Sequence, residues 1–524
     1  MSERIEILDT TLRDGAQMAG VSFTLSEKIA IARKLDEIGI DIIEGGWPAS
    51  NPKDMEFFRE IKKVSLSHSK IAAFGSTKKK GSSQDKNLET LVDAGTEYAV
   101  IFGKSWLLHV REVLKVTPEE NLSLIGESID FLKSHGIKVI YDAEHFFDGY
   151  KEDPEYALST IRTAQDAGAE TIALADTNGG TLPFELQRIF REVRGRINAR
   201  LGIHAHNDAG VAVANSLVAV NEGAVHVQGT INGLGERTGN ADLIQIIPAL
   251  VLKMGKKALR TYDDLKKLRS LSLYVYNLLN MQPNPYQPYV GRYAFTHKGG
   301  VHIDAMIKNV RSYEHIDPEL VGNERNFVIS EQSGRSSILI YANELGLNLT
   351  KDNPAVITTL NMVKQIEKYG SIEGADGTVK LMLLKNIGAY VEKFRVLYWM
   401  ANSREVNGRI EAEGEVIVRV GNDVYYERET GVGPVHAIDK ALRKALVKVF
   451  PELSSVTLET YKVTVTEGDK KGTASYVRVL IQFSDGKSSW TTASVSDNVL
   501  LASINALCDG YNYKLAMMDL RKRA

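Results

Sequence analysis

The chain has 524 residues, of which 43% are hydrophobic and 25% charged, and its formal net charge is −2 at pH 7. This length allows two to four domains, and the near-neutral charge gives no electrostatic reason to expect a nucleic-acid or membrane partner. A single cysteine, Cys508, excludes both an intrachain disulfide and a cysteine zinc site. No signal-peptide pattern and no membrane-length apolar run are present, so the sequence predicts a cytoplasmic protein.

The first half of the chain alternates short β-branched segments with longer segments of helical periodicity. Two helical segments begin with a capping residue followed by proline and acidic residues, at Thr117 and at Asp153. Eight strands and eight following helices by about residue 255 predict an α/β fold, a closed TIM (β/α)8 barrel rather than a doubly wound sheet. The predicted strands are Ile5–Thr10, Asp41–Glu44, Lys70–Phe74, Tyr98–Phe102, Lys138–Asp142, Thr171–Asp176, Leu201–His206 and Val225–Gly229.

The pattern changes after the barrel. Residues 256–385 are mostly helical around a proline-rich stretch, which predicts helical linker subdomains. Residues 386–524 show alternating strand patterns and a weak repeat, in which Gly433–Leu442 aligns with Asn498–Leu507. We interpret the duplicated strands-plus-helix unit as a C-terminal α+β regulatory domain, allosteric and dimerising, with a structural appendage that binds no ligand as the alternative. The predicted domains are thus a catalytic barrel over 1–255, linker subdomains over 256–385 and a regulatory domain over 386–524.

Polar residues follow the carboxyl ends of several predicted barrel strands. In this barrel class the active site lies at that rim, so we expect these side chains to converge there. The segments concerned are Asp9–Gly15, Tyr141–His145, Ala175–Gly179, Gly202–Asp208 and Gly233–Asn240.

Two histidines indicate a metal site. His204 and His206 are two residues apart on a predicted strand, so both imidazoles point to the barrel interior. Asp14 can supply a carboxylate and Asn240 an amide oxygen. A mixed nitrogen and oxygen site with open positions suits Mg²⁺, Mn²⁺ or Zn²⁺, and residue type does not decide among them.

Arg13, beside Asp14, places a fixed positive charge next to the predicted metal. Together they can polarise a 2-oxo acid and stabilise the alkoxide that forms when its keto carbon is attacked. Glu144 is a second acid or base group, or a partner of Arg13. Thr177 can donate a hydrogen bond to a substrate carboxylate, with a role as the cap of the next helix as the alternative. The glycines of Gly233–Gly239 have the wrong spacing for a dinucleotide loop and instead predict a close backbone approach to the metal site.

The chain resembles the acyltransferase family that includes the 2-isopropylmalate, homocitrate and citramalate synthases. The residues that carry the resemblance are Leu8–Gly15, His204–Asp208, Gly233–Asn240 and His297–Asp304, and in this order they are highly specific. The resemblance covers nearly the whole chain, because the duplicated C-terminal unit is similar to the family's allosteric domain. It implies a divalent metal and an electrostatic role for Arg13, with Glu144 near the reacting groups. The metal ligands that it implies are Asp14, His204, His206 and Asn240.

Two further residues match the family downstream of the barrel. His302 and Tyr313 correspond to linker residues that in relatives reach the active site of the partner subunit, which implies a homodimer. His302, Tyr313 and Glu144 are the candidates for the base that removes a proton from the acetyl methyl group. The resulting enolate attacks the keto carbon, and water then cleaves the thioester.

Three phrases resemble the longer-chain citramalate synthases: Glu44–Pro48, Phe102–Trp106 and Asp142–Gly149. This similarity implies a condensation of acetyl-CoA with pyruvate to (R)-citramalate and CoA, in isoleucine biosynthesis. Phe74 and Phe102 are expected to wall the pocket for the methyl group of pyruvate, with core packing as an equal alternative. Residue 142 is Asp where shorter citramalate synthases carry Tyr, so their pocket does not transfer directly.

Three other functions are compatible with part of this pattern. A 2-isopropylmalate or homocitrate synthase would use a larger 2-oxo acid with the same mechanism. A metal-dependent acyl-CoA lyase or aldolase would share the metal and Arg13, but the loop Gly233–Asn240 lacks the cysteine of the hydroxymethylglutaryl-CoA lyase. A catalytically silent amino-acid sensor would have no reason to keep the whole polar set. We expect catalysis in the barrel with feedback by an amino acid, and isoleucine is the effector that the resemblance implies.

Overall fold

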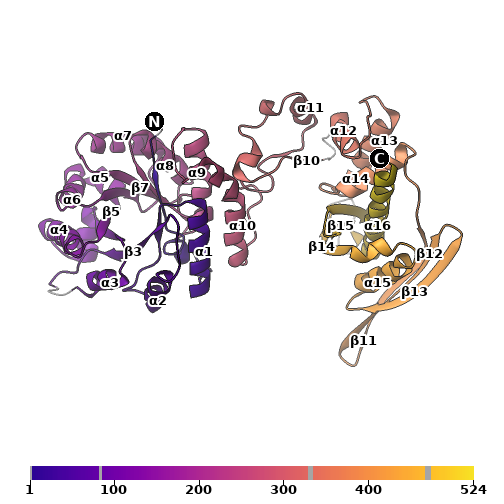
Figure 1. Cartoon of the computed structure of the whole chain (residues 1–524), viewed down its shortest axis with the longest axis horizontal. Helices are drawn as coiled ribbons and strands as arrows, with labels where there is room; N and C mark the ends of the chain where they lie inside the picture. Colours follow the sequence, from indigo (N-terminus) through magenta and orange to yellow (C-terminus); the bar gives the residue numbers. More distant parts are fainter. Residues whose placement is uncertain (1–2, 82–84, 329–333, 467–473, 524) are drawn as a thin grey trace. The chain divides into compact units, whose positions relative to one another are not determined.

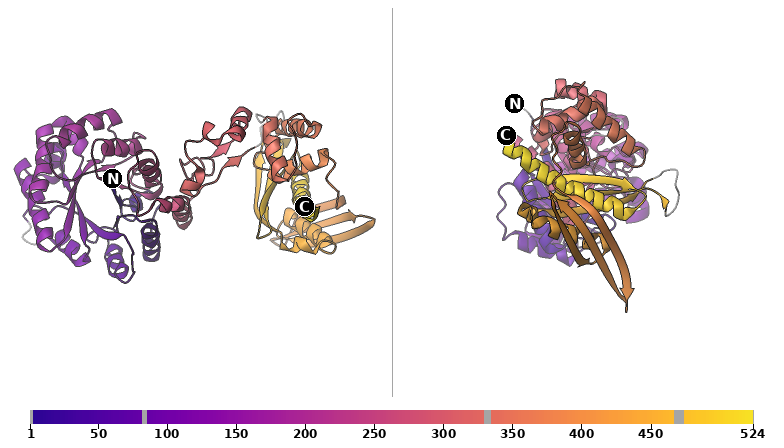
Figure 2. Two further views of the ribbon diagram at one scale, coloured as in Figure 1. Left: turned by 45° about the horizontal axis from the view of Figure 1, so that its top comes forward. Right: turned by 90° about the vertical axis from the view of Figure 1, so that its right-hand side faces the viewer.

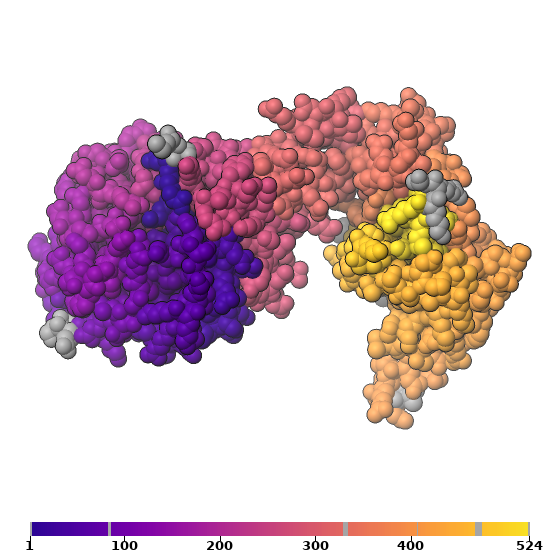
Figure 3. All heavy atoms as spheres, in the orientation of Figure 1, coloured from indigo at the N-terminus to yellow at the C-terminus, as the bar shows by residue number. Residues whose placement is uncertain are grey.

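The computed structural model describes residues 3–81, 85–328, 334–466 and 474–523. It forms two compact units, each described here by itself. One contains residues 1–295 and 316–325, and the other contains residues 296–315 and 326–524. Figure 3 shows all heavy atoms, with the barrel unit in indigo to magenta and the second unit running to yellow.

The first unit is built around a closed barrel of eight parallel strands in sequence order (Figure 1). Pairing of the first strand with the eighth closes the barrel. This confirms the predicted TIM barrel. The third, fourth and fifth strands run to Ser76, Lys104 and Glu144, further than the sequence predicted. The strands are β1 (Glu6–Asp9), β2 (Ile42–Glu44), β3 (Lys70–Ser76), β4 (Tyr98–Lys104), β5 (Lys138–Glu144), β6 (Thr171–Asp176), β7 (Leu201–Ala205) and β8 (His226–Gly229).

Helices alternate with these strands, and their ends follow from local chemistry. Thr117 caps α4 in a reciprocal capping box with Glu120, and Asp153 caps α6 by accepting from the N–H of Tyr156. Both predicted helix starts are therefore confirmed. The helices of this unit are α1 (Leu25–Ile38), α2 (Pro52–Ile61), α3 (Lys86–Ala94), α4 (Pro118–Ser134), α5 (Phe146–Glu152), α6 (Pro154–Asp166), α7 (Pro183–Arg194), α8 (Ala212–Asn221), α9 (Leu243–Leu252) and α10 (Leu268–Leu278).

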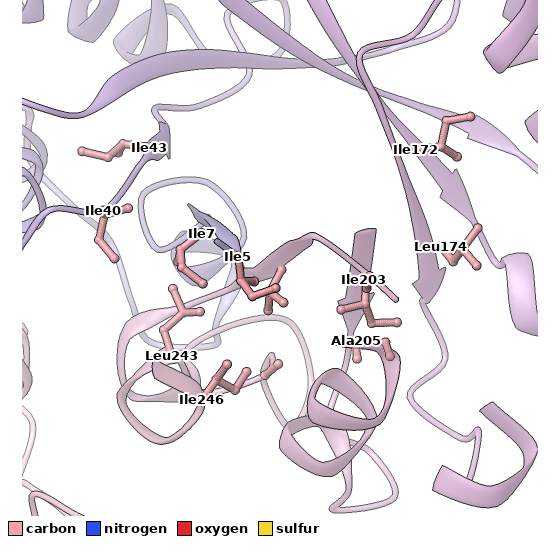
Figure 4. Close-up of a cluster of buried hydrophobic side chains, with 14 of the residues drawn as sticks. Ile5, Ile7, Ile40, Ile43, Ile172, Leu174, Ile203, Ala205, Leu243 and Ile246 are labelled. Carbon is pink, nitrogen blue, oxygen red and sulfur yellow. The ribbon is translucent and has the colours of Figure 1, made fainter. Parts of the chain in front are cut away.

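Strand alternation divides the barrel core into two layers. Ile7 of β1 belongs to the layer between the strands and the helices, and its neighbour Leu8 belongs to the barrel interior. Figure 4 shows part of the outer layer, where Ile7 lies near Leu243 of α9. The interior cluster consists of Leu8, Ile42, Ala72, Phe74, Tyr98, Val100 and Ile140, with Trp47 and Phe102 packed against it.

The second unit contains the predicted duplication (Figure 2). Each copy has a three-stranded antiparallel sheet followed by a helix, which agrees with the predicted repeat. Four further helices precede them: α11 (Gly300–Lys308), α12 (Arg335–Glu344), α13 (Pro354–Glu367) and α14 (Asp376–Asn386). The first copy contains β11 (Arg395–Val406), β12 (Arg409–Val420), β13 (Asp423–Gly431) and α15 (Pro434–Val447). The second copy contains β14 (Thr457–Val465), β15 (Val477–Ser484), β16 (Ser489–Ser496) and α16 (Val499–Arg523).

The predicted linker is shared between the two units. Residues 256–295 and 316–325 pack with the barrel, and residues 296–315 and 326–385 belong to the second unit. The functional boundaries at 255 and 385 stay a prediction. None of the described helices combines the length and apolarity that a membrane crossing requires.

Two phenylalanines of α7 give a matched test of the barrel core. Phe190 is fully buried against the outer layer, whereas Phe184 is 69% exposed. Phe190→Ala should lower the free energy of unfolding by about 3–5 kcal/mol, because it removes buried apolar area and leaves a cavity. Phe184→Ala should change it by less than about 0.5 kcal/mol. Urea unfolding followed by circular dichroism measures both, and equal midpoints for the two variants would contradict this assignment of the core.

Candidate metal centre and catalytic site

Asp14 and Arg13 are held at the barrel mouth by a tight turn after β1. The N–H groups of Arg13, Asp14 and Gly15 all donate to the carbonyl of Thr10, at 3.1, 2.9 and 3.1 Å. Thr10 is tied to β8, because its own N–H donates to the carbonyl of Gly229 at 2.8 Å. Two barrel strands therefore fix the position of this pair.

The four predicted metal ligands come together at this mouth, and all four are buried. The Nε2 atoms of His204 and His206 lie 3.3 Å apart, and each is 3.8 Å from Oδ2 of Asp14. Asn240 donates from Nδ2 to Oδ1 of Asp14 at 2.8 Å. Of the described residues, Asp14, His204 and His206 form the one histidine and carboxylate group with the closeness that a metal site needs.

The orientation of His204 is set by Gln228, a residue that the sequence did not reveal. Nδ1 of His204 lies 3.0 Å from Oε1 of Gln228. Since an amide oxygen only accepts, Nδ1 carries the hydrogen and Nε2 presents its lone pair toward Asp14 and His206. Gln228 is held in turn, because its Nε2 donates to Oδ1 of Asp142 at 2.7 Å. This is the outer support expected for a metal-binding imidazole.

The protonation states of His204, His206 and Asp14 also suit the binding of a cation. Burial, with His206 beside it, lowers the pKa of His204, and burial lowers the pKa of His206, so both imidazoles are neutral at pH 7. Burial alone would raise the pKa of Asp14, but Arg13 and the histidines outweigh it and bring this pKa to about 2. Oδ1 of Asn240 is buried without a hydrogen-bond partner among the described residues. Two bare nitrogens, a carboxylate and a free amide oxygen thus suit a divalent metal.

Arg13 is buried between two carboxylates and an aromatic ring. It contacts Oδ2 of Asp14 at 2.9 Å and Oε2 of Glu44 at 2.6 Å. Its guanidinium carbon lies 3.7 Å from the ring centroid of Phe74. The partner of Arg13 is therefore Glu44, at the end of β2, and not Glu144. The alternative that Glu144 supports Arg13 was wrong, and the signal for Glu44 was its place at a strand end on the same rim.

Glu144 and Thr177 lie on the same side of the barrel. Glu144, the last residue of β5, forms an ion pair with Lys104, the last residue of β4. The hydroxyl of Thr177 accepts from the N–H of His145 at 2.9 Å and keeps its own hydrogen for donation. The alternative role of Thr177 as the cap of the next helix was wrong, because the N-cap position of α7 is residue Leu182.

Phe74 and Phe102 lie side by side in the barrel interior. Their rings stack at a centroid distance of 5.5 Å, and Trp47 meets both edge-on at 5.6 and 5.7 Å. All three belong to the interior cluster. A side chain that packs the core can also wall a pocket above it, so the predicted role in substrate choice stays a prediction.

His302 and Tyr313 belong to the second unit. His302 lies on α11, and Tyr313 follows the short helix η5 (Val310–Ser312). Their rings stack at 4.1 Å, and Tyr313 is 45% exposed. The structure brings this pair together, and its approach to the active site of a partner subunit stays a prediction.

The glycine loop approaches the metal ligands closely. Gly235 has a φ of +155°, and a Cβ atom there would lie 2.3 Å from Nδ2 of Asn240 and 3.1 Å from Oδ1 of Asp14. At Gly239 a Cβ atom would lie 1.9 Å from the carbonyl of Gly233. These glycines leave room for the ligands, as the sequence predicted.

Comparison with known proteins identifies the family of the chain. The HMGL-like family model matches residues 4–275, and the homocitrate synthase post-HMGL domain-like model matches residues 289–370. The LeuA allosteric (dimerisation) domain model matches residues 373–515. The (R)-citramalate synthase of Sulfolobus acidocaldarius is 51% identical over 99% of this chain and 98% of its own length. The chain belongs to the citramalate synthase group of the HMGL-like family.

Other relatives agree with this placement. The (R)-citramalate synthase of Geobacter sulfurreducens is 50% identical over 98% of this chain and 97% of its own length. The 2-isopropylmalate synthase of Methanocaldococcus jannaschii is 32% identical over 99% of this chain and 96% of its own length. The family resemblance seen in the sequence motifs is confirmed, and so is the similarity of the C-terminal unit to the family's allosteric domain.

Gln228 gives a test of the support behind the metal ligands. Gln228→Leu removes the acceptor of His204 Nδ1 while keeping the size of the side chain, so metal affinity should fall by about 10–100-fold. Gln187→Leu is the matched control, because Gln187 lies on α7 and donates to Glu222. Calorimetric titration with Mn²⁺ measures both variants. Unchanged affinity in Gln228→Leu would show that this bond does not tune the site.

Gly235 tests the close approach of the loop. Gly235→Ala should lower metal affinity by about 10–100-fold as well, because the added methyl group displaces Asn240. Gly180→Ala is the control, since a Cβ atom at Gly180 would meet nothing within 4 Å. The same titration applies. Equal affinities for the two variants would rule out the predicted crowding.

Proposed function

We propose that this chain condenses acetyl-CoA with pyruvate and hydrolyses the thioester, giving (R)-citramalate and CoA. Relatives named (R)-citramalate synthase at 42–51% identity over 98–99% of the chain support this function. The observation in the structure that carries it is the gathering of Asp14, His204, His206 and Arg13 at the barrel mouth. This set can hold a 2-oxo acid and stabilise negative charge on its keto oxygen.

A divalent metal completes the site, and Mg²⁺ or Mn²⁺ is our choice, with Zn²⁺ as the alternative. Held by Asp14, His204, His206 and Asn240, it supplies Lewis acidity toward the keto group of the 2-oxo acid. Arg13 contributes a permanent positive charge beside that group. Glu44 keeps the guanidinium in place through the 2.6 Å contact to Nε. Thr177 offers a hydroxyl hydrogen to the substrate carboxylate.

The base must accept a proton from the acetyl methyl group. Glu144 is the candidate that lies in the barrel unit, and we propose it for this step; His302 and Tyr313 remain candidates from a partner subunit. The methyl C–H bond breaks, the proton goes to the carboxylate, and the electron pair forms the new C–C bond to the keto carbon. The π electrons of the keto C=O bond move to its oxygen, and the alkoxide formed takes up a proton to become the hydroxyl group. Water then adds to the thioester carbonyl, and CoA leaves as the thiol. Atoms and charges balance without a redox partner.

Two observations favour a small 2-oxo acid: the names of the relatives, and the aromatic group formed by Phe74, Phe102 and Trp47. The relatives named (R)-citramalate synthase at 42–51% identity are more similar to this chain than the 2-isopropylmalate synthase at 32% identity. Phe74, Phe102 and Trp47 fill the barrel interior with rigid rings, which favours a substrate with a small side chain. A lyase or a silent sensor finds no support in these relatives.

The second unit is proposed to regulate and dimerise the enzyme. The match to the LeuA allosteric (dimerisation) domain supports a homodimer with feedback by an amino acid, and we propose isoleucine as the effector. The catalytic barrel over 1–255, the linker over 256–385 and the regulatory domain over 386–524 are proposed as functional divisions. A place in isoleucine biosynthesis and a cytoplasmic location belong to the same proposal.

The test is release of CoA thiol from acetyl-CoA with pyruvate, 2-oxoisovalerate or 2-oxoglutarate, each with and without a chelator. We expect release with pyruvate, loss on chelation, and recovery with Mg²⁺ or Mn²⁺. Arg13→Gln should lower kcat by about 100-fold or more, because it removes a charge aimed at the developing alkoxide. Preference for a larger acid would overturn the substrate and keep the mechanism, and no release with any acid would overturn the function.

A further inference from the structure

We propose that Lys104 is a positioning residue for the condensation, which holds the carboxylate of Glu144 in one orientation, directed toward the acetyl methyl group. This inference rests on the proposed function and on Glu144 as the base. Lys104 lies within the phrase Phe102–Trp106, but the sequence assigned it no role. Its role follows from the place that the barrel gives it.

The barrel register makes Lys104 and Glu144 direct neighbours. They are the last residues of β4 and β5, and they are paired in the parallel ladder between these strands. The Lys104 ammonium forms an ion pair with Oε2 of Glu144. The side chains are 12% and 22% exposed, so a substrate can reach the pair while bulk water hardly screens it.

The backbone on both sides of the pair is anchored. Asn121 of α4 is fully buried and donates from Nδ2 to the carbonyl of Lys104 at 2.8 Å. The N–H of Ser105 donates to the carbonyl of Glu144 at 3.1 Å. The pair is therefore held by two strands and a helix, unlike a surface ion pair between mobile side chains.

Lys104 also has a counterpart across the aromatic group. Its ammonium lies 5.2 Å from the ring centroid of Phe102, and the Arg13 guanidinium lies 3.7 Å from that of Phe74. The two rings stack against each other. Each cation thus lies against a ring of the same stack: Arg13 pairs with Asp14 and Glu44, and Lys104 pairs with Glu144.

The reaction needs a cation at this second position. A general base must lie within hydrogen-bond reach of the proton that it removes, and an ion pair with an anchored cation holds the carboxylate in that place. His109 interacts electrostatically with both Lys104 and Glu144, and His145 and Asp148 lie near His109. Burial, with His145 and Lys104 nearby, lowers the pKa of His109, so this imidazole is neutral at pH 7. Among the described residues, Lys104 is the cation that contacts Glu144.

A matched control exists in the same barrel. Lys138, the first residue of β5, forms an ion pair with Glu97 at 3.2 Å and lies 5.1 Å from the ring centroid of Tyr98. It repeats the lysine, glutamate and aromatic ring of the Lys104 site at the amino end of the strands, away from the catalytic rim. Lys138 is 46% exposed and Lys104 12%, so Lys138 controls for the loss of a lysine and glutamate pair in the barrel, and Lys104→Arg controls for the buried position.

The experiment compares Lys104→Met, Lys104→Arg and Lys138→Met with the wild-type enzyme, using acetyl-CoA and pyruvate. We expect Lys104→Met to lower kcat by about 100-fold, with the KM for pyruvate changed by less than about threefold. Lys104→Arg keeps the charge and should stay within about tenfold of wild type, and Lys138→Met within about twofold. The primary isotope effect with methyl-deuterated acetyl-CoA should increase in Lys104→Met, because proton transfer becomes slower.

Several outcomes would overturn the proposal. A kcat of Lys104→Met within about threefold of wild type would show that Glu144 needs no cation. Equal losses in Lys104→Met and Lys104→Arg, or an unchanged isotope effect beside a lower kcat, would point to a structural role. If Lys104→Met does not fold by circular dichroism, Lys104→Gln takes its place: an increased isotope effect in that variant supports the proposal, and an unchanged one contradicts it. A wild-type enzyme without activity would overturn the proposed function instead, so the two failures are distinct.

Discussion

The barrel mouth buries more negative charge than its own cations neutralise, and the rest of the site depends on this imbalance. Asp14 and Glu44 share the single guanidinium of Arg13, and Asp142 lies nearby without a cation of its own. Burial raises the pKa of Glu44, and burial together with Glu44 raises that of Asp142 to about 8. A divalent cation against Asp14 would restore the balance, and two neutral imidazoles and a free amide oxygen are in place to hold it.

Each strand end contributes one part of the arrangement. The turn after β1 carries Arg13 and Asp14, β2 ends at Glu44, and β7 and β8 supply His204 and Gln228. Because parallel strands in a barrel end at the same rim, residues far apart in the sequence meet without any need for long loops. The stacked rings of Phe74 and Phe102 lie beneath the charges and keep the interior closed. The fold thus places a layer of apolar aromatic side chains directly beneath the charged residues of the rim.

Much of the site could be predicted because its signals are local. His204 and His206 are two residues apart on a strand, and this spacing alone points both rings inward. The partners of these residues could not be predicted in the same way. Gln228 and Glu44 act through contacts between strands, which depend on barrel register and side-chain reach. Lys104 was missed for a further reason, because β4 and β5 were each predicted to end two residues early, at Phe102 and Asp142.

Other ambiguities have a physical origin as well. Phe74 and Phe102 point into the barrel whether they pack the core or line a pocket, so strand alternation cannot separate the two roles. In the C-terminal unit the sequence repeat correctly predicted both helices. Each of them follows a three-stranded sheet, so the same pattern occurs twice. The structure resolves the strand pairing there and leaves the ligand chemistry of that unit to experiment.

The chain of contacts from Asp142 through Gln228 to His204 has a consequence for the divergence of substrate choice. Residue 142 lies on the barrel interior, and its carboxyl group also holds Gln228 against the imidazole of His204. A mutation of Asp142 would therefore change the shape of the barrel interior and the orientation of the His204 imidazole together. Lineages that exchange one 2-oxo acid for another by this route must change residues 142 and 228 in concert, so such a pair should evolve together more often than either position does alone.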